Sequence, residues 1–355
     1  MREIRTSGSE GGEAELNRPS LPLSGLHTLF IFRSLAPGYS DRRSFSGSMA
    51  VEEKQVAKGD EPQDCRSCEQ ADCTSRNRRQ DESEEEFRQR QDLGRKMCQI
   101  GHKLLILSGK GGVGKSTVAA NLAVSLALAG KSVGLLDVDI HGPSIPRLMG
   151  LEGQQLQMHG SEIVPLEVGG NLKVMSIGFL LGSPEDAVIW RGPMKYGVIR
   201  QFLGEVEWGP LDYLIIDAPP GTGDEPLSVA QLVGDGAGAV LVTTPQELSV
   251  ADVRRSVSFC RKLSLPVVGI IENMSGLVCP HCNGRIEVFK TGGGEALAHE
   301  MNVPLLGRIP IDPKIVECGD SGVPYIHRFA DSDAATAFAG VVDRILGGTA
   351  SNTDG

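Results

Sequence analysis

The chain has 355 residues, of which 40% are hydrophobic and 23% are charged. This length is enough for one large domain or two modest ones, each with a hydrophobic core. The formal net charge of −10 argues against binding of nucleic acid or an anionic membrane through bulk electrostatics. A transmembrane helix needs an apolar run of about 18 residues or more, and no apolar run in this sequence is that long. We therefore expect a cytoplasmic protein with no membrane or nucleic-acid partner.

The first hundred residues differ in character from the rest of the chain. Residues 1–48 show no sustained hydrophobic periodicity, which predicts a disordered leader, or a spurious extension if translation begins at Met49. We expect residues 49–100 to form a flexible segment that contains cysteines and a charged linker. Within it, the high charge of residues 80–92 predicts a solvated helix or a linker.

From residue 101 onward, predicted strands and helices alternate, so we expect a folded domain over residues 101–348 and a disordered tail over residues 349–355. Short apolar runs predict buried strands at Leu104–Leu107, Val133–Leu136, Val174–Ile177, Tyr213–Ile216, Ala239–Val242, Val267–Ile271 and Leu305–Ile309. Helices are predicted at Ser116–Ala129, Met194–Leu203, Pro226–Leu232, Ser249–Leu263, Gly294–Met301 and Ala334–Leu346. This alternation predicts an α/β fold with a doubly wound, mostly parallel sheet, whose ligands bind beyond the carboxyl ends of the strands.

A phosphate-binding loop lies between the first predicted strand and the first predicted helix of this domain. The motif G-x-x-x-x-G-K-[ST] is matched by Gly109, Lys110, Gly111, Gly112, Val113, Gly114, Lys115, Ser116 and Thr117. Its glycines let backbone N–H groups surround phosphate oxygens, and the start of the following helix favours the same anion. We expect Lys115 to reach the β- and γ-phosphates of ATP, and the Ser116 hydroxyl to bind Mg²⁺.

Acidic residues follow two of the predicted strands and complete this site. We expect the carboxylate of Asp217 to bind Mg²⁺ through a water molecule, because Mg²⁺ keeps much of its hydration shell. Asp137 is expected to hold the loop that follows its strand, and Gly221 to let the backbone sense the γ-phosphate. A strand-end Asp can also be a helix cap, and Glu225 has the same alternative. The set predicts phosphoryl transfer to water, that is, an ATP hydrolase.

The early lysine of the loop gives the deviant form of the Walker A motif. It resembles the loop of septum-positioning, partition, arsenite-pump and nitrogenase-iron-protein ATPases. That resemblance implies a P-loop NTPase that forms an ATP-dependent homodimer, in which Lys110 reaches the nucleotide of the partner copy. It also implies that Asp139 orients the attacking water, so that Lys110, Lys115 and Asp139 are the catalytic residues. A solvated loop lysine is the alternative for Lys110.

Several further strings occur together over about Leu104 to Leu346. They are Asp139-Ile-His-Gly-Pro-Ser144, Trp190-Arg-Gly-Pro-Met194, Asp217-Ala-Pro-Pro-Gly-Thr-Gly-Asp224, Glu272-Asn-Met-Ser275, Cys279-Pro-His-Cys282, Gly292-Gly-Gly-Glu295 and Gly307-Arg-Ile-Pro-Ile-Asp312. Together they resemble the Mrp/ApbC-type iron–sulfur cluster carrier ATPases, relatives of the eukaryotic cytosolic cluster scaffold. The resemblance implies transfer of clusters to apoproteins, and contacts from Asn273, Pro310 and Asp312 to the adenine. Asn273 by itself is also a common turn residue.

The closely spaced cysteines indicate metal binding or redox chemistry rather than disulfides, because the chain is long and has no evident secretory signal. Cys279 and Cys282 cannot alone complete the four ligands of a [4Fe–4S] cluster or a zinc site, but a two-fold dimer supplies four thiolates. The resemblance implies a [4Fe–4S] cluster that bridges two subunits. A zinc knuckle with His281 as a third ligand and a thioredoxin-type redox pair are the alternatives.

The N-terminal segment holds three more closely spaced cysteines, Cys65, Cys68 and Cys73, with Cys98 as a distant candidate fourth ligand. A second cluster, a zinc site and a delivery arm without stable metal all remain open for them. Cys260 and Cys318 are expected in the core, and His141 in a structural or switch-loop contact.

Two other functions stay open on the residues alone. One is a zinc-stabilised, nucleotide-sensing regulatory protein. The other is a positioning ATPase of the septum or partition type, although the chain end from Phe338 to Gly355 contains one Arg and no Lys, which is unlike a basic membrane-binding helix.

Overall fold

Apolar runs along the chain form an eight-stranded sheet in the computed structural model, which describes residues 77–78, 80, 82–180, 192–234, 236–279 and 281–350. All of these residues belong to one unit, residues 58–355. The predictions made for residues 1–48 and for Cys65, Cys68 and Cys73 fall outside the described residues.

The strands of the sheet lie in the order β12-β9-β8-β1-β7-β2-β6-β5. Their bounds are β1 Ile100–Ser108, β2 Val133–Asp137, β5 Leu166–Val168, β6 Leu172–Ser176, β7 Leu211–Asp217, β8 Ala237–Thr243, β9 Val267–Glu272 and β12 Leu305–Arg308. Every neighbouring pair is parallel except β5 and β6, which are antiparallel. The prediction of a doubly wound, mostly parallel sheet is confirmed.

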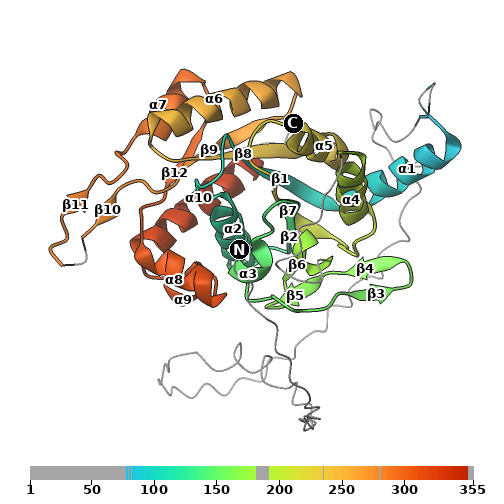
Figure 1. Cartoon of the computed structure of the whole chain (residues 1–355), viewed down its shortest axis with the longest axis horizontal. Helices are drawn as coiled ribbons and strands as arrows, with labels where there is room; N and C mark the ends of the chain where they lie inside the picture. Colours follow the sequence, from blue (N-terminus) through green and yellow to red (C-terminus); the bar gives the residue numbers. More distant parts are fainter. Residues whose placement is uncertain are drawn as a thin grey trace, which may run out of the picture. The chain divides into compact units, whose positions relative to one another are not determined.

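Helices cover both faces of this sheet (Figure 1). One face carries α1 Glu84–Cys98, α4 Gly192–Gly204, α5 Asp224–Val233, α6 Glu247–Lys262 and α7 Gly293–Glu300. The other carries α2 Lys115–Leu128, α3 Ile145–Leu148, α8 Pro313–Ser321, α9 Tyr325–Arg328 and α10 Asp333–Ala350. In the central strand, Leu105 and Leu107 pack into the first layer, while Leu104 and Ile106 pack into the second. Burial on both faces explains why the strands read as continuous apolar runs.

Helix α1 agrees with a solvated helix over residues 84–92, which are exposed or half-buried, but it continues beyond the charged stretch to Cys98. It begins with a capping box between Ser83 and Glu86, and it buries Leu93 and Met97 in the core layer that also contains α4. These two apolar residues are four apart on one helix face, but the charged first turns conceal so short a pattern in the sequence. The folded domain therefore begins at α1 at the latest. At the other end, α10 continues to Ala350, beyond the expected start of the tail.

Short elements are the ones that periodicity does not predict. They include the hairpins β3 Gln157–His159 with β4 Glu162–Val164, and β10 Leu277–Val278 with β11 Arg285–Ile286, and the 3-10 helix η2 Ile177–Leu180. Figure 1 shows the two hairpins at opposite ends of the sheet. In the described part of the chain, no helix combines the length and the apolar character needed to cross a bilayer.

Candidate functional site

The P-loop connects the carboxyl end of β1 to the first turn of α2, as its motif requires. Gly112 and Gly114 have φ of 81° and 79°, in the left-handed region that favours glycine. A Cβ at Gly114 would lie 2.4 Å from Nδ2 of Asn273, so the loop also depends on glycine for its close approach to the segment after β9. A Cβ at Gly111 or Gly112 would meet no atom within 4 Å. That side of the loop is therefore open enough for a phosphate group to approach the backbone.

Lys115 brings the loop together with the two acidic strand ends. Its Nζ lies 2.5 Å from Oδ1 of Asp217 and 3.9 Å from Oδ2 of Asp139. The lysine is buried, with 6% of its surface exposed, so both contacts form away from solvent. Three of the residues that the sequence assigns to one site thus meet at the carboxyl ends of β2 and β7, next to the P-loop.

Asp137 and Asp217 face each other in the register of β2 and β7, and both are fully buried. Burial, and then the charge of Asp217, raise the pKa of Asp137 to about 8. The Asp137 carboxyl accepts hydrogen bonds from the Ser176 hydroxyl at 2.9 Å, from N of Asp139 at 3.0 Å and from N of Ile145 at 3.3 Å. These contacts fix the segment that carries Asp139, whose own pKa is raised by burial and lowered in part by Lys115.

The carboxyl of Asp217 has the chemistry that a Mg²⁺ site needs. Among the described residues, its Oδ2 is buried and has no hydrogen-bond partner, although a buried acceptor is normally satisfied. The Ser116 hydroxyl lies 3.5 Å from Nζ of Lys115, and Oδ1 of the same Asp217 carboxylate lies 2.5 Å from that Nζ, so the hydroxyl and the carboxylate border the same lysine. Mg²⁺ prefers oxygen ligands and keeps several waters, so one serine, one carboxylate and phosphate oxygens fit it.

Gly221 has a φ of 94° and donates its backbone N–H to O of Ser108 at 2.8 Å. The segment after β7 is therefore joined to the end of β1, next to the P-loop. A role for Gly221 in sensing the γ-phosphate stays a prediction.

A cavity of about 430 Å³ lies beside the P-loop. It is lined by Gly114, Thr117, Val118, Ser144, Arg147, Leu148, Asn273, Met274, Phe289, Pro310, Ile311, Asp312, Ile315, Val316, Gly319, Asp320 and Phe338. The Asn273 side chain donates from Nδ2 to O of Val113 at 2.9 Å, which binds this wall to the P-loop. Asp312 caps α8 by accepting from N of Lys314 at 2.9 Å, and it also accepts from the Tyr325 hydroxyl at 2.5 Å. Asn273, Pro310 and Asp312 thus share one cavity wall, and two of them also stabilise the fold.

Cys279 and Cys282 lie at the tip of the β10–β11 hairpin. N of Cys279 donates to O of Gly284 at 2.9 Å, and N of Asn283 donates to O of Cys279 at 2.9 Å. Asn283 has a φ of 57°, which closes the turn. Hydrogen bonds from the backbone N–H groups of His281 and Cys282 lower the pKa of Cys279. The turn therefore favours a thiolate, which is the form that binds metals.

This tip provides two thiol ligands from one chain. Within the described ranges, no three His, Cys, Asp or Glu side chains come together in a way that could hold a metal ion. His281, the third ligand of the zinc-knuckle alternative, is exposed and completes no such group. A four-ligand site at Cys279 and Cys282 thus requires ligands from outside the described part of this chain.

The other cysteines of the described chain differ from this pair. Cys260 on α6 is fully buried, and burial raises its pKa to about 11. Cys318 on α8 is buried as well, with 1% of its surface exposed. The expectation of core positions for both is confirmed. Cys98 is exposed at the end of α1.

Lys110 is half-exposed in the P-loop, and its contact with the nucleotide of a partner copy stays a prediction.

Sequence reasoning missed a cluster of charges beside the switch segment. Lys195 of α4 forms an ion pair with Glu225 of α5, and its Nζ lies 2.8 Å from Nε2 of His141. Nε2 of His141 lies 3.3 Å from Oε1 of Glu225. Glu225 therefore bridges three segments, where a simple helix cap was the alternative, and His141 contacts side chains of α4 and α5, for which a structural or switch-loop contact was expected. Only the two acidic residues in the first turn of α5, Asp224 and Glu225, could have pointed to it.

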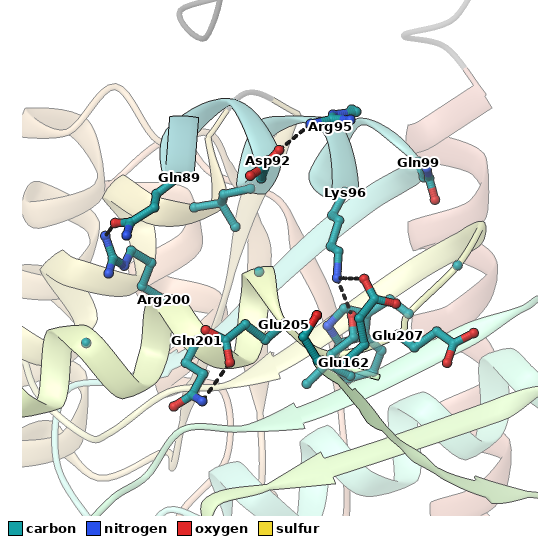
Figure 2. Close-up of a pocket in the computed structure, with 17 residues that line it drawn as sticks. Gln89, Asp92, Arg95, Lys96, Gln99, Glu162, Arg200, Gln201, Glu205 and Glu207 are labelled. Atoms are coloured by element: carbon teal, nitrogen blue, oxygen red, sulfur yellow. Dashed lines mark hydrogen bonds and ion pairs between the residues drawn. The ribbon is translucent and has the colours of Figure 1, made fainter. Parts of the chain in front are cut away.

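A larger cavity of about 870 Å³ lies at the other end of the sheet, where Gln99 precedes β1 and Gly209 precedes β7. Figure 2 shows its polar side chains contacting one another: Lys96 pairs with Glu162 at 2.5 Å, Arg95 pairs with Asp92, and Arg200 donates to Gln89. No residue of the P-loop or of the cysteine hairpin lines it, but Glu162 of the β3–β4 hairpin does. Its lining carries four carboxylates, Asp92, Glu162, Glu205 and Glu207, against three cations, Arg95, Lys96 and Arg200, so it offers no excess of positive charge for a phosphate.

Comparison with known proteins agrees with this geometry. Residues 99–346 match the ParA family of NUBPL iron-transfer P-loop NTPases. An iron–sulfur cluster carrier protein of Methanocaldococcus jannaschii is 49% identical over 274 residues, which cover 77% of this chain and 94% of that protein.

Two solved structures of nucleotide-binding proteins share the fold. A nucleotide-binding protein of Archaeoglobus fulgidus in complex with ADP is 42% identical with a TM-score of 0.59, over 66% of this chain and 92% of that one. The septum site-determining protein MinD of Pyrococcus horikoshii, complexed with Mg-ADP, is 26% identical with a TM-score of 0.53, over 69% of this chain and 95% of that one. The match over residues 99–346 and the 49% identity show that this chain belongs to the NUBPL iron-transfer P-loop NTPase family.

Proposed function

We propose that this chain carries an iron–sulfur cluster on Cys279 and Cys282 and transfers it to apoproteins, under the control of ATP. One observation carries the proposal: a pair of thiols, of which Cys279 accepts hydrogen bonds from backbone amides, lies on a hairpin that is hydrogen-bonded to a wall of the cavity beside the P-loop. The 49% identical iron–sulfur cluster carrier protein supports the same cargo. The cluster is a substrate in this scheme, delivered to client apoproteins in the cytoplasm.

The nucleotide in the proposal is ATP, and its phosphates bind at the P-loop. Lys115 lies where it can exchange its contact with Asp217 for a phosphate oxygen. Ser116 and, through water, Oδ2 of Asp217 would hold Mg²⁺, which neutralises phosphate charge when bound. Asp139, at the end of the fixed switch segment, would orient the water that attacks the γ-phosphate and releases ADP and phosphate. Lys110 would act on the nucleotide of a second copy.

Two copies of the chain are needed to hold the cargo. A [4Fe–4S] cluster takes four cysteine ligands, and each hairpin tip offers two. An isologous dimer presents the same hairpin twice, so the cluster would bridge the two-fold axis. The ATP sites and the bridging cluster would then be coupled, because both depend on how the two copies lie against each other.

The test removes the thiol pair and measures iron and sulfide. Cys65, Cys68 and Cys73 are first replaced by Ala, so that the N-terminal cysteines do not contribute to the signal. In this background, Cys279→Ala/Cys282→Ala is compared with Cys98→Ala, which removes an exposed cysteine outside the hairpin. After anaerobic reconstitution, we expect the double variant to lose the visible absorption of the cluster and its iron and sulfide, while it keeps its affinity for ATP.

Two outcomes would contradict the proposal. If the double variant binds iron and sulfide like its parent and still activates an apoprotein, Cys279 and Cys282 do not hold the cluster. A parent that retains zinc and takes up no sulfide would instead favour the nucleotide-sensing protein.

A further inference from the structure

Glu272, the last residue of β9, is a fully buried acidic side chain that the nucleotide chemistry does not use. Its Oε1 accepts from the Ser275 hydroxyl at 2.5 Å and from N of Gly292 at 2.9 Å. Its Oε2 accepts from N of Gly294 at 2.5 Å. Ser275 lies where the chain leaves β9 for the cysteine hairpin, and Gly292 and Gly294 lie where it returns into α7. One carboxylate therefore joins both ends of the segment that carries Cys279 and Cys282.

The start of α7 is built to close on this carboxylate. Gly292 has a φ of 85° and makes no side-chain cap. A Cβ at Gly294 would lie 3.0 Å from Cβ and from Oε2 of Glu272, and a Cβ at Gly293 would lie 2.3 Å from O of Pro245. A helix N-terminus favours a negative charge, and a buried carboxylate needs its donors. The run of glycines therefore allows Glu272 to cap α7 from another element.

The same segment is bonded to the wall of the nucleotide cavity. N of Ser275 donates to O of Ile309 at 2.9 Å, and N of Ile311 donates to O of Gly276 at 2.8 Å. N of Ile309 in turn donates to O of Glu272 at 2.8 Å, and Leu277 bridges Ile311. Asn273, between Glu272 and this ladder, is bonded to the P-loop through O of Val113.

We propose that Glu272 is a positioning residue that makes the cysteine hairpin follow the state of the nucleotide site. The hairpin is attached at its base to the cavity wall through the backbone ladder, and the carboxylate holds its two ends together. When Pro310–Asp312 or Asn273 is displaced, the cavity wall and the hairpin then move together as one rigid body, and the hairpin tip moves with them. Without the hydrogen bonds of the Glu272 carboxylate, the returning strand β11 and α7 are no longer held to the backbone ladder. A displacement of the cavity wall then deforms the hairpin and does not move its tip. The inference rests on the proposed function only in that the hairpin carries the cargo.

Glu272→Gln in the full chain tests the inference. The protein is used without an iron–sulfur cluster, so that the result does not depend on a bound cluster. Gln keeps the size of the side chain but turns one acceptor into an N–H₂ donor. We expect hydrogen exchange at the amides of Gly292 and Gly294 to accelerate by about tenfold, as for a weakened hydrogen bond to a charged acceptor. We also expect Mg-ATP to change the alkylation rates of Cys279 and Cys282 in the wild type, and this nucleotide response to be lost in the variant. ATP affinity should stay within about threefold, because Glu272 does not line the nucleotide cavity.

Glu295→Gln is the matched control, because Glu295 is a carboxylate in the same first turn of α7 that forms an exposed ion pair with Arg308. It should leave both the exchange at Gly292 and the ATP response unchanged. If Glu272→Gln does not fold, Ser275→Ala removes one of the three donors and should weaken the same response. A folded Glu272 variant with unchanged exchange and unchanged ATP response would overturn the inference, as would a wild type whose thiols do not respond to ATP. Neither result depends on iron and sulfide binding, which tests the proposed function separately.

Discussion

The phosphate end of the molecule and the cysteine hairpin are held in place by different means. At the phosphate end, Asp137 and Asp217 are fully buried and set opposite each other by the register of two parallel strands. At the hairpin, β10 and β11 contribute two residues each, and Cys282 is exposed. The acidic strand ends therefore cannot move without disturbing the core, whereas the hairpin has few core contacts and can move together with the cavity wall to which it is bonded. The two chemistries are separated into a rigid part and a movable part.

The strongest test of the rigid part is Lys115→Ala. The substitution removes the only amino group that lies within 4.0 Å of Asp217 or Asp139 among the described residues. We expect the rate of ATP hydrolysis to fall by about a hundredfold to a thousandfold, the effect of losing a charge that stabilises the transition state. Steady-state phosphate release measures it. Lys262→Ala, at the exposed end of α6, should keep the wild-type rate. Equal rates in the two variants would show that Lys115 does not act on the nucleotide.

The thiols allow the movable part to be compared with the core in one experiment. Backbone hydrogen bonds lower the pKa of Cys279 from 9.0, and burial raises that of Cys260 to about 11. Because the thiolate is the reactive form, the alkylation rate of each thiol rises as the pH rises through its own pKa. At about pH 8 we expect Cys279 in metal-free protein to react more than about a hundredfold faster than Cys260.

Mass spectrometry of the labelled peptides measures this ratio, and labelling in concentrated urea is the control, since unfolding should make the two rates similar. A midpoint for Cys279 at or above its value in urea would mean that the hairpin does not stabilise the thiolate.

A smaller effect is expected where the two parts meet, at Gly114. Its φ of 79° is in the left-handed region, and a Cβ there would approach Nδ2 of Asn273 to 2.4 Å. Gly114→Ala should cost about 1–3 kcal/mol of the free energy of unfolding. Gly197→Ala in α4, where a Cβ meets nothing within 4 Å, should instead stabilise by up to about 1 kcal/mol. Urea unfolding of both variants separates them, and a neutral Gly114→Ala would mean that the loop can move away from Asn273.

Much of the rigid part could be predicted from the sequence, because its signals are local. The P-loop motif lies between an apolar run and a helical pattern, and parallel strands bring Asp137 and Asp217 to one edge of the sheet. The contact of Lys115 with Asp217 was not predicted, since nothing local links two residues that meet only through the strand order. Lys195 was missed for the same reason, because its partners come from two other segments.

The movable part was predicted by its chemistry more than by its shape. Cys-x-x-Cys indicated a turn and a metal, but strands of two residues carry no periodicity. Glu272 closes an apolar run and has the appearance of a strand end. Its role depends on the returning backbone of Gly292 and Gly294, which only the folded chain brings to it. In α1, two apolar residues were too few to reveal a packed helix among the charges.

The place of β12 in the sheet has a consequence for how the protein is made. β12 pairs with β9, and the cavity beside the P-loop is lined by the residues just after it, Pro310–Asp312, and by later residues as far as Phe338 in α10. The cysteine hairpin lies between β9 and β12 in the chain, so a ribosome releases its thiols before it releases the last wall of the cavity. During that interval the nascent chain presents Cys279 and Cys282 with the cavity still incomplete. If cargo is loaded under nucleotide control, as proposed, loading can therefore begin only after synthesis has reached Phe338 in α10, the last residue that lines the cavity.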